Sequence, residues 1–321
     1  MVDVVTHQLG LAEVMKRHDP QGNLATIAEV LNKTNLIIQD AMWREANDFW
    51  SNKTTRRSSL PTGTFRRLYK GVPLGSSDTV QLVDTIGQLY DRSEIDVDAV
   101  MSAADPEQFR SDEDKAYVEG LGQTIATKVF YGNALTAPEE FTGLAPRMDA
   151  LATTNNVLNE GGTGSDVTSI FVVTWGIGGV HMLYPRNSKV GLQMRNLGEV
   201  DATDADGYKY RAYATEFKWN IGMAVKHPKA MGRIANIESA GSSNIFDEDN
   251  LITLLNRMVV NENTRIYCNE TVMTQAEIRL KDKSNVNWST QDGLGGVPFM
   301  KFRGIPVRKC DAIVNTEDAL T

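Results

Sequence analysis

Residues 106–131 carry the signals of one long helix, and a rod of this length constrains how the rest of the chain can fold. Asp105 is a residue type that caps helix N-termini, Pro106 is tolerated in a first helical turn, and Gln108 suits a capping box. Gly132 is a typical C-terminal stop. Between these signals apolar residues recur at every fourth position and predict a buried face: Tyr117, Leu121, Ile125 and Val129. At about 1.5 Å per residue the helix is about 39 Å long, more than the width of a small domain.

The segment that precedes the helix, residues 51–77, contains no acidic residue. Its cations are Lys53, Arg56, Arg57, Arg66, Arg67 and Lys70. Pro61-Thr62-Gly63 near its middle is a turn signal, and the aromatic and aliphatic residues after it favour strand. The segment is therefore predicted to be a long, basic, exposed hairpin. A basic patch with aromatic residues can bind nucleic acid, and a purely solvated loop is another alternative. We favour a loop that lies on another copy of the same protein.

Acidic residues are concentrated directly after this hairpin, between residues 91 and 119. Seven of them are candidate contact partners for it: Asp91, Glu94, Asp96, Asp98, Asp112, Glu113 and Asp114. A basic segment and an acidic surface on one chain are complementary between copies, and complementary charge steers association and fixes register. One exposed ion pair contributes only about 0–1 kcal/mol, so such contacts matter where many of them repeat around a ring.

The rest of the chain predicts an α+β protein. The first 50 residues contain two helical patterns, at residues 24–31 and at residues 36–48, the second with Asn35 as its cap. Four strands are expected after residue 165, the last two joined by a hairpin turn at residues 204–207: 168–175, 180–184, 192–202 and 208–225. A helix at 248–260, a strand at 265–269, a helix at 271–280 and a strand pair around Gly304 complete the pattern.

The sequence offers no recognisable catalytic, cofactor or metal site. Gly161-Gly162-Thr163-Gly164 precedes a strand instead of joining a strand to a helix, and it lacks the lysine of a phosphate-binding loop. The four histidines are scattered, and Cys268 and Cys310 form no metal-binding pair. No apolar run is long enough to span a membrane, and no signal peptide is recognised at the start. The net charge is -8, whereas a protein that binds DNA tightly usually has a basic surface.

Several stretches resemble one known family. They are Phe141–Met148 (FTGLAPRM), Trp175-Gly176, His181–Leu192 (HMLYPRNSKVGL), Leu197-Gly198-Glu199, Asp204–Tyr213 (DADGYKYRAY) and Lys218–Ile237 (KWNIGMAVKHPKAMGRIANI). With the order of the elements, they resemble the major capsid proteins of tailed double-stranded-DNA phages, which have the Hong Kong 97 type of fold. The closest resemblance is to those of certain short-tailed phages.

The resemblance implies a domain plan and a role. Residues 1–50 are then an N-terminal arm, 51–77 the extended loop, 78–148 the peripheral domain with spine helix 106–131, and 149–321 the axial domain with the remaining peripheral strands. The chain is expected to self-assemble into hexamers and pentamers of an icosahedral shell that encloses double-stranded DNA without sequence-specific contacts. The virion capsid is expected to form in the host bacterial cytoplasm, with a separate scaffolding protein and a portal protein as partners and a cement protein as a further candidate partner.

Two other functions remain open on the sequence alone. An encapsulin-like nanocompartment shell has the same fold and encloses an enzyme cargo instead of a genome. A soluble carbohydrate- or nucleotide-processing enzyme is less favoured, because it needs a site that the sequence does not reveal. Closed particles distinguish both shell readings from the enzyme, and packaged DNA distinguishes the phage shell from the nanocompartment.

Overall fold

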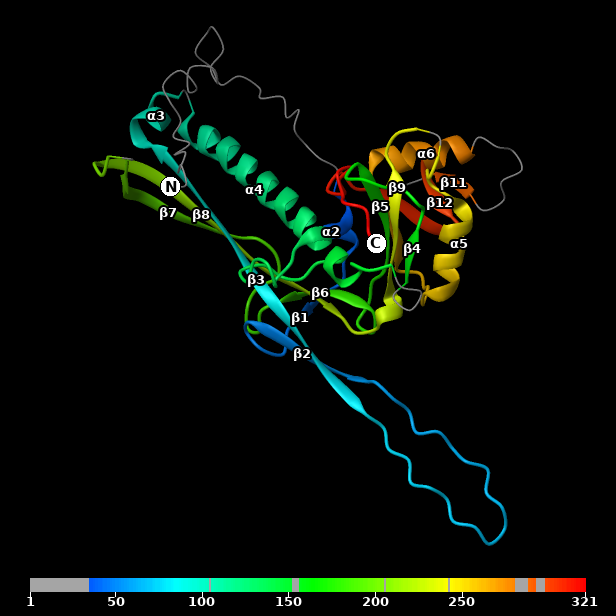
Figure 1. The fold of residues 1–321 in the computed structure, drawn as a ribbon. Coiled ribbons are helices and arrows are strands. Elements are labelled where there is room, and N and C mark those ends of the chain that lie inside the picture. The colour runs from blue at the N-terminus through cyan, green and yellow to red at the C-terminus, as the bar shows by residue number, and fades with distance from the viewer. Residues whose placement is uncertain are drawn as a thin grey trace.

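The computed structural model of the protein describes residues 35–103, 105–151, 156–204, 206–241, 243–280, 288–292 and 298–321. The described strands form two sheets, one of six strands and one of seven (Figure 1). The long helix α4 (Pro106–Tyr131) runs along the first sheet and packs its last turns against the second. None of the described helices has the length and apolar character to cross a membrane.

The first sheet is built on two long antiparallel strands, β3 (Thr79–Asp96) and β8 (Lys209–Val225). β3 pairs with β2 over its first part and with β8 over the rest, and in Figure 1 it runs obliquely from α3 at the upper left to the base of the projecting chain. The other strands of this sheet are β1 (Trp43–Glu45), β2 (Ser51–Arg57), β6 (Val180–Tyr184) and β7 (Gln193–Thr203). The short helix α3 (Val97–Met101) turns the chain from β3 into α4.

The second sheet has the strand order β11-β12-β13-β10-β5-β9-β4. Its strands are β4 (Val157–Asn159), β5 (Val167–Thr174), β9 (Met231–Glu238), β10 (Thr264–Cys268), β11 (Trp288–Asp292), β12 (Pro298–Phe302) and β13 (Ile305–Lys309). Helices α5 (Glu248–Arg257) and α6 (Glu270–Leu280) cover one face. Because alternate strand residues point to opposite faces, Ile170 and Val172 of β5 pack with these helices, whereas Phe171 and Val173 pack with α4.

Helix α4 has the bounds that its sequence signals predict. The carboxylate of Asp105 accepts hydrogen bonds from the backbone N–H groups of Glu107 and Gln108, both at 3.1 Å. The second half of the expected capping box is wrong, because the Gln108 amide donates to Asp112 at 2.8 Å. Of the expected buried face, Leu121, Ile125 and Val129 are at most 4% exposed. Tyr117 is half-buried, and its ring stacks on Phe217 with the centroids 5.6 Å apart.

The helix expected at residues 36–48 is wrong. Only Ile37–Asp40 (α2) is helical, and Trp43–Glu45 forms strand β1, which pairs in parallel with β6. Asn35 is no cap, because its side-chain oxygen accepts from the Ala312 N–H at 3.1 Å. The free edge of β6 offers the backbone partners that a helix would have supplied locally, so tertiary pairing overrides the helical spacing. The expected helix at residues 24–31 lies outside the described residues.

The elements predicted in the second half of the chain are present with small shifts of their bounds, whereas strands β4, β9 and β11 were not predicted. The hairpin between β7 and β8 is confirmed, and the Asp204 carboxylate holds its turn by accepting from the Asp206 and Tyr208 N–H groups at 3.0 and 2.7 Å. The helix expected at 248–260 ends earlier, at Arg257. It stops because Met258 is extended and buried, and because the Val259 N–H donates to the carbonyl of Lys229 at 2.9 Å.

Candidate inter-subunit interface

The chain between β2 and β3 projects from the body of the molecule (Figure 1). Strand pairing ends at Arg57 and Thr79, and the Ser58 N–H then donates to the carbonyl of Asp78 at 2.9 Å. Every residue from 58 to 78, which we call the projecting loop, is exposed. The long exposed hairpin predicted from the charge pattern is therefore present, but its outer part is a loop that has no core of its own. The strand expected around Phe65, Leu68 and Tyr69 is wrong, because the pairing of β2 with β3 ends before these residues.

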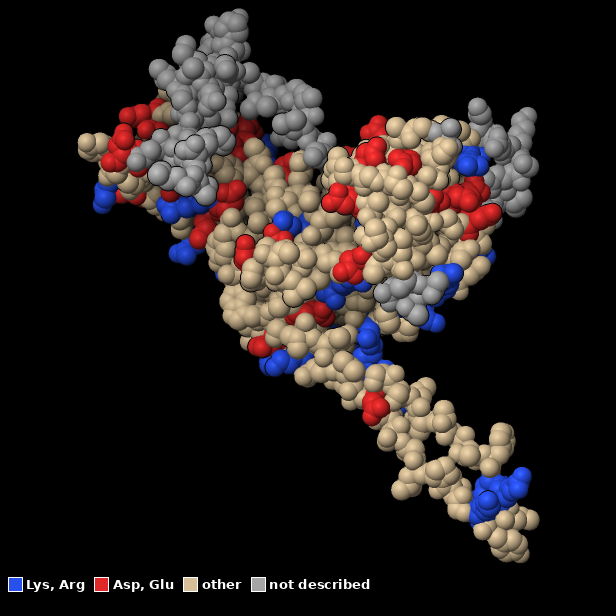
Figure 2. Space-filling view, viewed as in Figure 1, with Lys and Arg blue, Asp and Glu red and all other residues tan. Residues whose placement is uncertain are grey.

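The end of the projecting loop combines large apolar side chains with cations. Phe65 and Tyr69 are fully exposed, and Leu68 is 87% exposed. Arg66, Arg67 and Lys70 alternate with them along the sequence, and Figure 2 shows cations gathered at the outer end of the loop. Exposed apolar groups of this size gain nothing from their own subunit, whereas burying one against a partner contributes about 1.5–3 kcal/mol.

The other three candidate cations lie nearer the body of the subunit. Lys53, Arg56 and Arg57 belong to β2 and pair with Val83, Val80 and Thr79 of β3. The side-chain amide of Asn47 holds the Lys53 backbone by accepting from its N–H at 2.9 Å and donating to its carbonyl at 2.6 Å. The six cations predicted as one group are thus two groups, one on a strand and one at the loop end.

The acidic candidates lie at the opposite end of β3. Asp91, Glu94 and Asp96 are on its last part, Asp98 is on α3, and Asp112, Glu113 and Asp114 are on α4. Figure 2 shows acidic side chains around this end of the molecule. An 18-residue strand is about 60 Å long. The basic loop end and the acidic end therefore cannot meet within one subunit, and any contact between them joins two copies.

Several of these acids also have structural roles that sequence reasoning missed. Asp96 caps α3 by accepting from the Asp98 N–H at 2.8 Å, and Glu94 pairs with Arg92 at 2.8 Å. Asp112 pairs with Lys115 at 2.7 Å, and hydrogen bonds from Lys115 and then Gln108 lower its pKa. Burial raises the pKa of Asp114, which accepts from the Thr215 hydroxyl at 3.2 Å.

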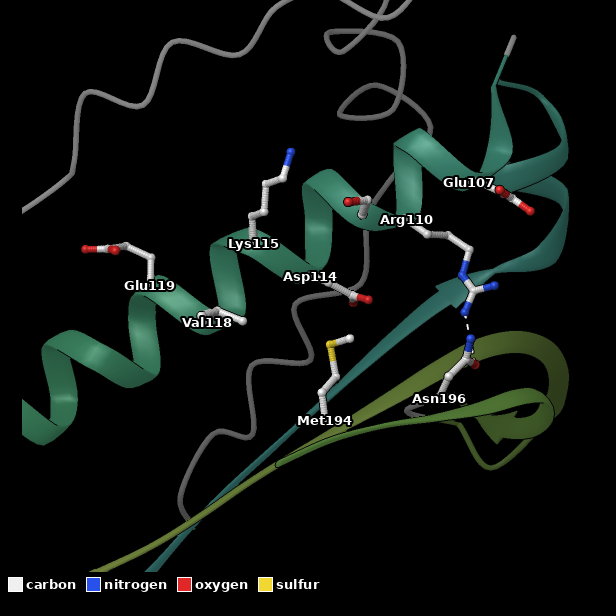
Figure 3. Close-up of a pocket in the computed structure, with 9 residues that line it drawn as sticks. Glu107, Arg110, Asp114, Lys115, Val118, Glu119, Met194 and Asn196 are labelled. Atoms are coloured by element: carbon white, nitrogen blue, oxygen red, sulfur yellow. Dashed lines mark hydrogen bonds between the residues drawn. The ribbon is translucent and has the colours of Figure 1, made fainter. Parts of the chain in front are cut away.

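A hollow of about 620 Å³, the helix hollow, separates the N-terminal half of α4 from β7 (Figure 3). Arg110 closes one end, because it donates to the Asn196 side chain at 3.2 Å and its guanidinium lies 4.6 Å from the ring centre of Tyr213. Val118 and Met194 supply apolar surface, and Met194 is 61% exposed. Three carboxylates border the hollow: Glu107, Asp114 and Glu119. This site could not be predicted from the sequence, because Met194 and α4 are brought together only by the sheet.

The described residues contain no group of three metal-binding side chains. Cys268 and Cys310 are both buried, and burial raises the pKa of each thiol to about 12. Both thiols are therefore protonated at neutral pH, whereas a cysteine nucleophile reacts as the thiolate. The glycine-rich segment Gly161–Gly164 packs on β9, because the Gly162 N–H donates to the carbonyl of Asn236 at 2.8 Å.

A family model and several solved structures match this chain. The family model of the major capsid protein GP7 matches residues 19–321. The solved structure of bacteriophage Epsilon15 matches with 31% sequence identity and a TM-score of 0.77, and each chain is covered over 100% of its length. The capsid of the native GTA particle matches at 10% identity and a TM-score of 0.48, over 68% of this chain and 94% of that one. The encapsulin of Synechococcus elongatus matches at 11% identity and a TM-score of 0.46, over 72% and 97%.

No curated protein sequence matches the chain. The full-length match to the Epsilon15 structure confirms the Hong Kong 97 type of fold, with α4 as its long helix. It also confirms the predicted role, a structural subunit that assembles into a bacteriophage shell. The family match, the shared fold and the projecting loop lead to one assignment: this chain belongs to the GP7 family of major capsid proteins.

Proposed function

We propose that copies of this chain form the hexamers and pentamers of an icosahedral shell, and that the projecting loop of each copy clamps a neighbouring copy. The observation that carries the proposal is the exposure of every residue from 58 to 78, with Phe65, Leu68 and Tyr69 among them. A loop of this composition stabilises a structure only when a second molecule covers it.

The helix hollow is the acceptor that we propose for the loop end. Its apolar surface at Val118 and Met194 suits Phe65 and Leu68. Its three carboxylates, Glu107, Asp114 and Glu119, outnumber its two cations, Arg110 and Lys115, so the hollow keeps a negative charge that is complementary to the loop cations. Each contact is weak, but a loop in every subunit repeats it around a closed ring, and linked contacts gain from each other by multivalency.

The shell is proposed to enclose double-stranded DNA and to have no catalytic turnover. Assembly in the host bacterial cytoplasm, a separate scaffolding protein, a portal protein and a cement protein belong to the same proposal, and they rest on the family resemblance. The peripheral domain of this proposal is the first sheet with α4, and the axial domain is the second sheet with α5 and α6.

Electron microscopy of the full-length protein, produced in bacteria and with its scaffolding partner where needed, tests the proposal. Closed icosahedral particles are expected, and particles from infected cells should contain nuclease-protected DNA. A variant in which residues 60–76 are replaced by a short Gly-Ser turn should keep the melting temperature of the subunit and form no closed particles. Closed particles at normal yield from this variant contradict the clamp, and enzyme cargo in place of DNA supports the nanocompartment.

A further inference from the structure

A second hollow, of about 500 Å³, lies at the base of β2 and is lined by four cations. Arg44 comes from β1, Lys53 from β2, Arg186 from the turn after β6, and Lys226 from the position directly after β8. Among the described residues, none of these four side chains makes an ion pair or a hydrogen bond. We call this site the basic hollow.

The one acid in the lining does not neutralise these charges. Glu45 contributes one carboxylate, and its Oε1 accepts from the Asn187 N–H at 2.8 Å. Four cations and one anion leave the hollow positive, in a chain whose net charge is -8. An uncompensated group of like charges is destabilising, and an anion that enters the hollow relieves the repulsion.

The positive field extends into the sheet beneath. His181 of β6 is 1% exposed, and its Nδ1 has no hydrogen-bond partner among the described residues. Its pKa is lowered to about 4, first by burial and then by Arg44 and Lys226. The histidine therefore stays neutral at pH 7, and it adds no charge that could balance or reinforce the four cations.

The lining also indicates which kind of anion fits. Apart from the charged residues it consists of Asn47, Asn52, Thr54 and Thr55, and its only apolar residue is Ala46. Arginine, lysine and threonine side chains are usual partners of backbone phosphates, whereas the side-chain amides of Asn47 and Asn52 already hydrogen bond within the subunit. An acidic peptide segment also brings apolar groups that need cover, which the helix hollow offers and the basic hollow does not.

We propose that the basic hollow binds phosphate groups of the nucleic acid that the shell encloses. The proposal rests on the proposed function, because it needs DNA inside the particle. The binding is independent of sequence, since contacts to phosphates carry no sequence information. One such site in each copy gives an acidic shell a regular set of attachment points for DNA.

A matched pair of double variants tests this site. Arg186→Gln with Lys226→Gln removes two charges from the basic hollow. Lys209→Gln with Lys229→Gln removes two charges from exposed lysines outside it, neither of which forms an ion pair among the described residues. Binding of a short fluorescent DNA duplex by the full-length protein is measured at increasing salt. Two lost phosphate contacts should lower the slope of log affinity against log salt by about two. The control variant should keep the wild-type slope.

Crosslinking in DNA-filled particles gives an independent readout. Formaldehyde should link DNA to Lys53 and Lys226 more strongly than to Lys209 and Lys229, as mapped by mass spectrometry. If wild-type particles contain no DNA, the proposed function fails and this inference fails with it. If they contain DNA but both lysine pairs crosslink equally, only this inference is overturned. If Arg186→Gln with Lys226→Gln abolishes shells while the control assembles, the hollow binds a neighbouring subunit instead, and the phosphate site is again overturned.

Discussion

The guanidinium of Arg233 lies 2.8 Å from the carboxylate of Glu317, and both side chains are buried. Arg233 is in β9, whereas Glu317 is in the segment that follows the last strand. Arg233 also donates to the Ser169 hydroxyl and to the carbonyl of Met148, both at 3.0 Å. The hydroxyl of Tyr131, the last residue of α4, donates to the other oxygen of Glu317. This network therefore ties the long helix, the second sheet and the last residues of the chain together.

Removing one partner of this pair should destabilise the subunit strongly. Arg233→Met leaves the Glu317 carboxylate buried without its cation, and such changes cost about 3–5 kcal/mol. Arg233→Met combined with Glu317→Leu removes both charges, and it should recover a large part of that loss. Urea unfolding of the full-length protein before assembly measures both effects. A double variant that is no more stable than the single one would show that packing, and not the buried charge, decides the outcome.

The buried face of α4 should be sensitive to truncation, while its exposed face should not. Leu121 is 4% exposed, so Leu121→Ala is expected to lower the free energy of unfolding by about 2–5 kcal/mol. Val118 lies on the same helix and is 39% exposed, so Val118→Ala should change it by about 0.5 kcal/mol or less. Thermal melts of the two variants side by side make the comparison. Equal losses in both would contradict the assignment of the buried face.

Glu160 should make stability depend on pH. Burial raises its pKa from 4.5 to about 7, although it accepts hydrogen bonds from Asn250 and from the Asp247 N–H. Between these two values the folded state binds the proton more strongly than the unfolded state does. The contribution of this group to stability therefore falls as pH rises from about 4.5 to about 7. Glu160→Gln keeps the acceptor oxygen and cannot ionise, so its melting temperature should fall less over that window. If the melting temperatures of variant and wild type change by the same amount across this pH window, Glu160 does not have this role.

How far the sequence predicts this structure depends on whether the signal is local. The bounds of α4 follow from Asp105, Pro106 and Gly132, which act through the backbone beside them. The exposed hairpin follows from a segment without acids or a core pattern. The prediction of a helix at Trp43–Glu45 is wrong because this segment pairs with β6, which lies far along the chain. Glu317 resembles an ordinary surface acid in the sequence, and only the fold places it beside Arg233.

The candidate site shows the same division. The cations of the projecting loop and the acids of β3 and α4 are visible in the sequence as charge patterns. The helix hollow is not, because it needs Met194 of β7 to lie opposite Val118 of α4. The basic hollow likewise joins residues from four separate strands or turns. Binding surfaces that arise from packing stay hidden until the sheet order is known.

The clamp between neighbouring subunits is tested by reversing charge on each side in turn. Arg67→Glu with Lys70→Glu should leave the melting temperature of the subunit unchanged, because both side chains are exposed on the projecting loop. Lys209→Glu with Lys229→Glu makes the same change in net charge elsewhere and serves as the control. Raising the salt concentration should weaken wild-type assembly in the same direction, since salt screens exposed charge.

The most direct measurement is sedimentation of assembly reactions for the loop variant, alone and combined with Glu107→Lys and Glu119→Lys at the helix hollow. The loop variant should remain as folded, unassembled subunits while the control forms shells. The combined variant should regain shells in part, because opposite charges again face each other across the contact. Shells at wild-type yield from the loop variant, or no recovery at all in the combined variant while the Glu107→Lys and Glu119→Lys subunit remains folded, would contradict a clamp between the projecting loop and the helix hollow.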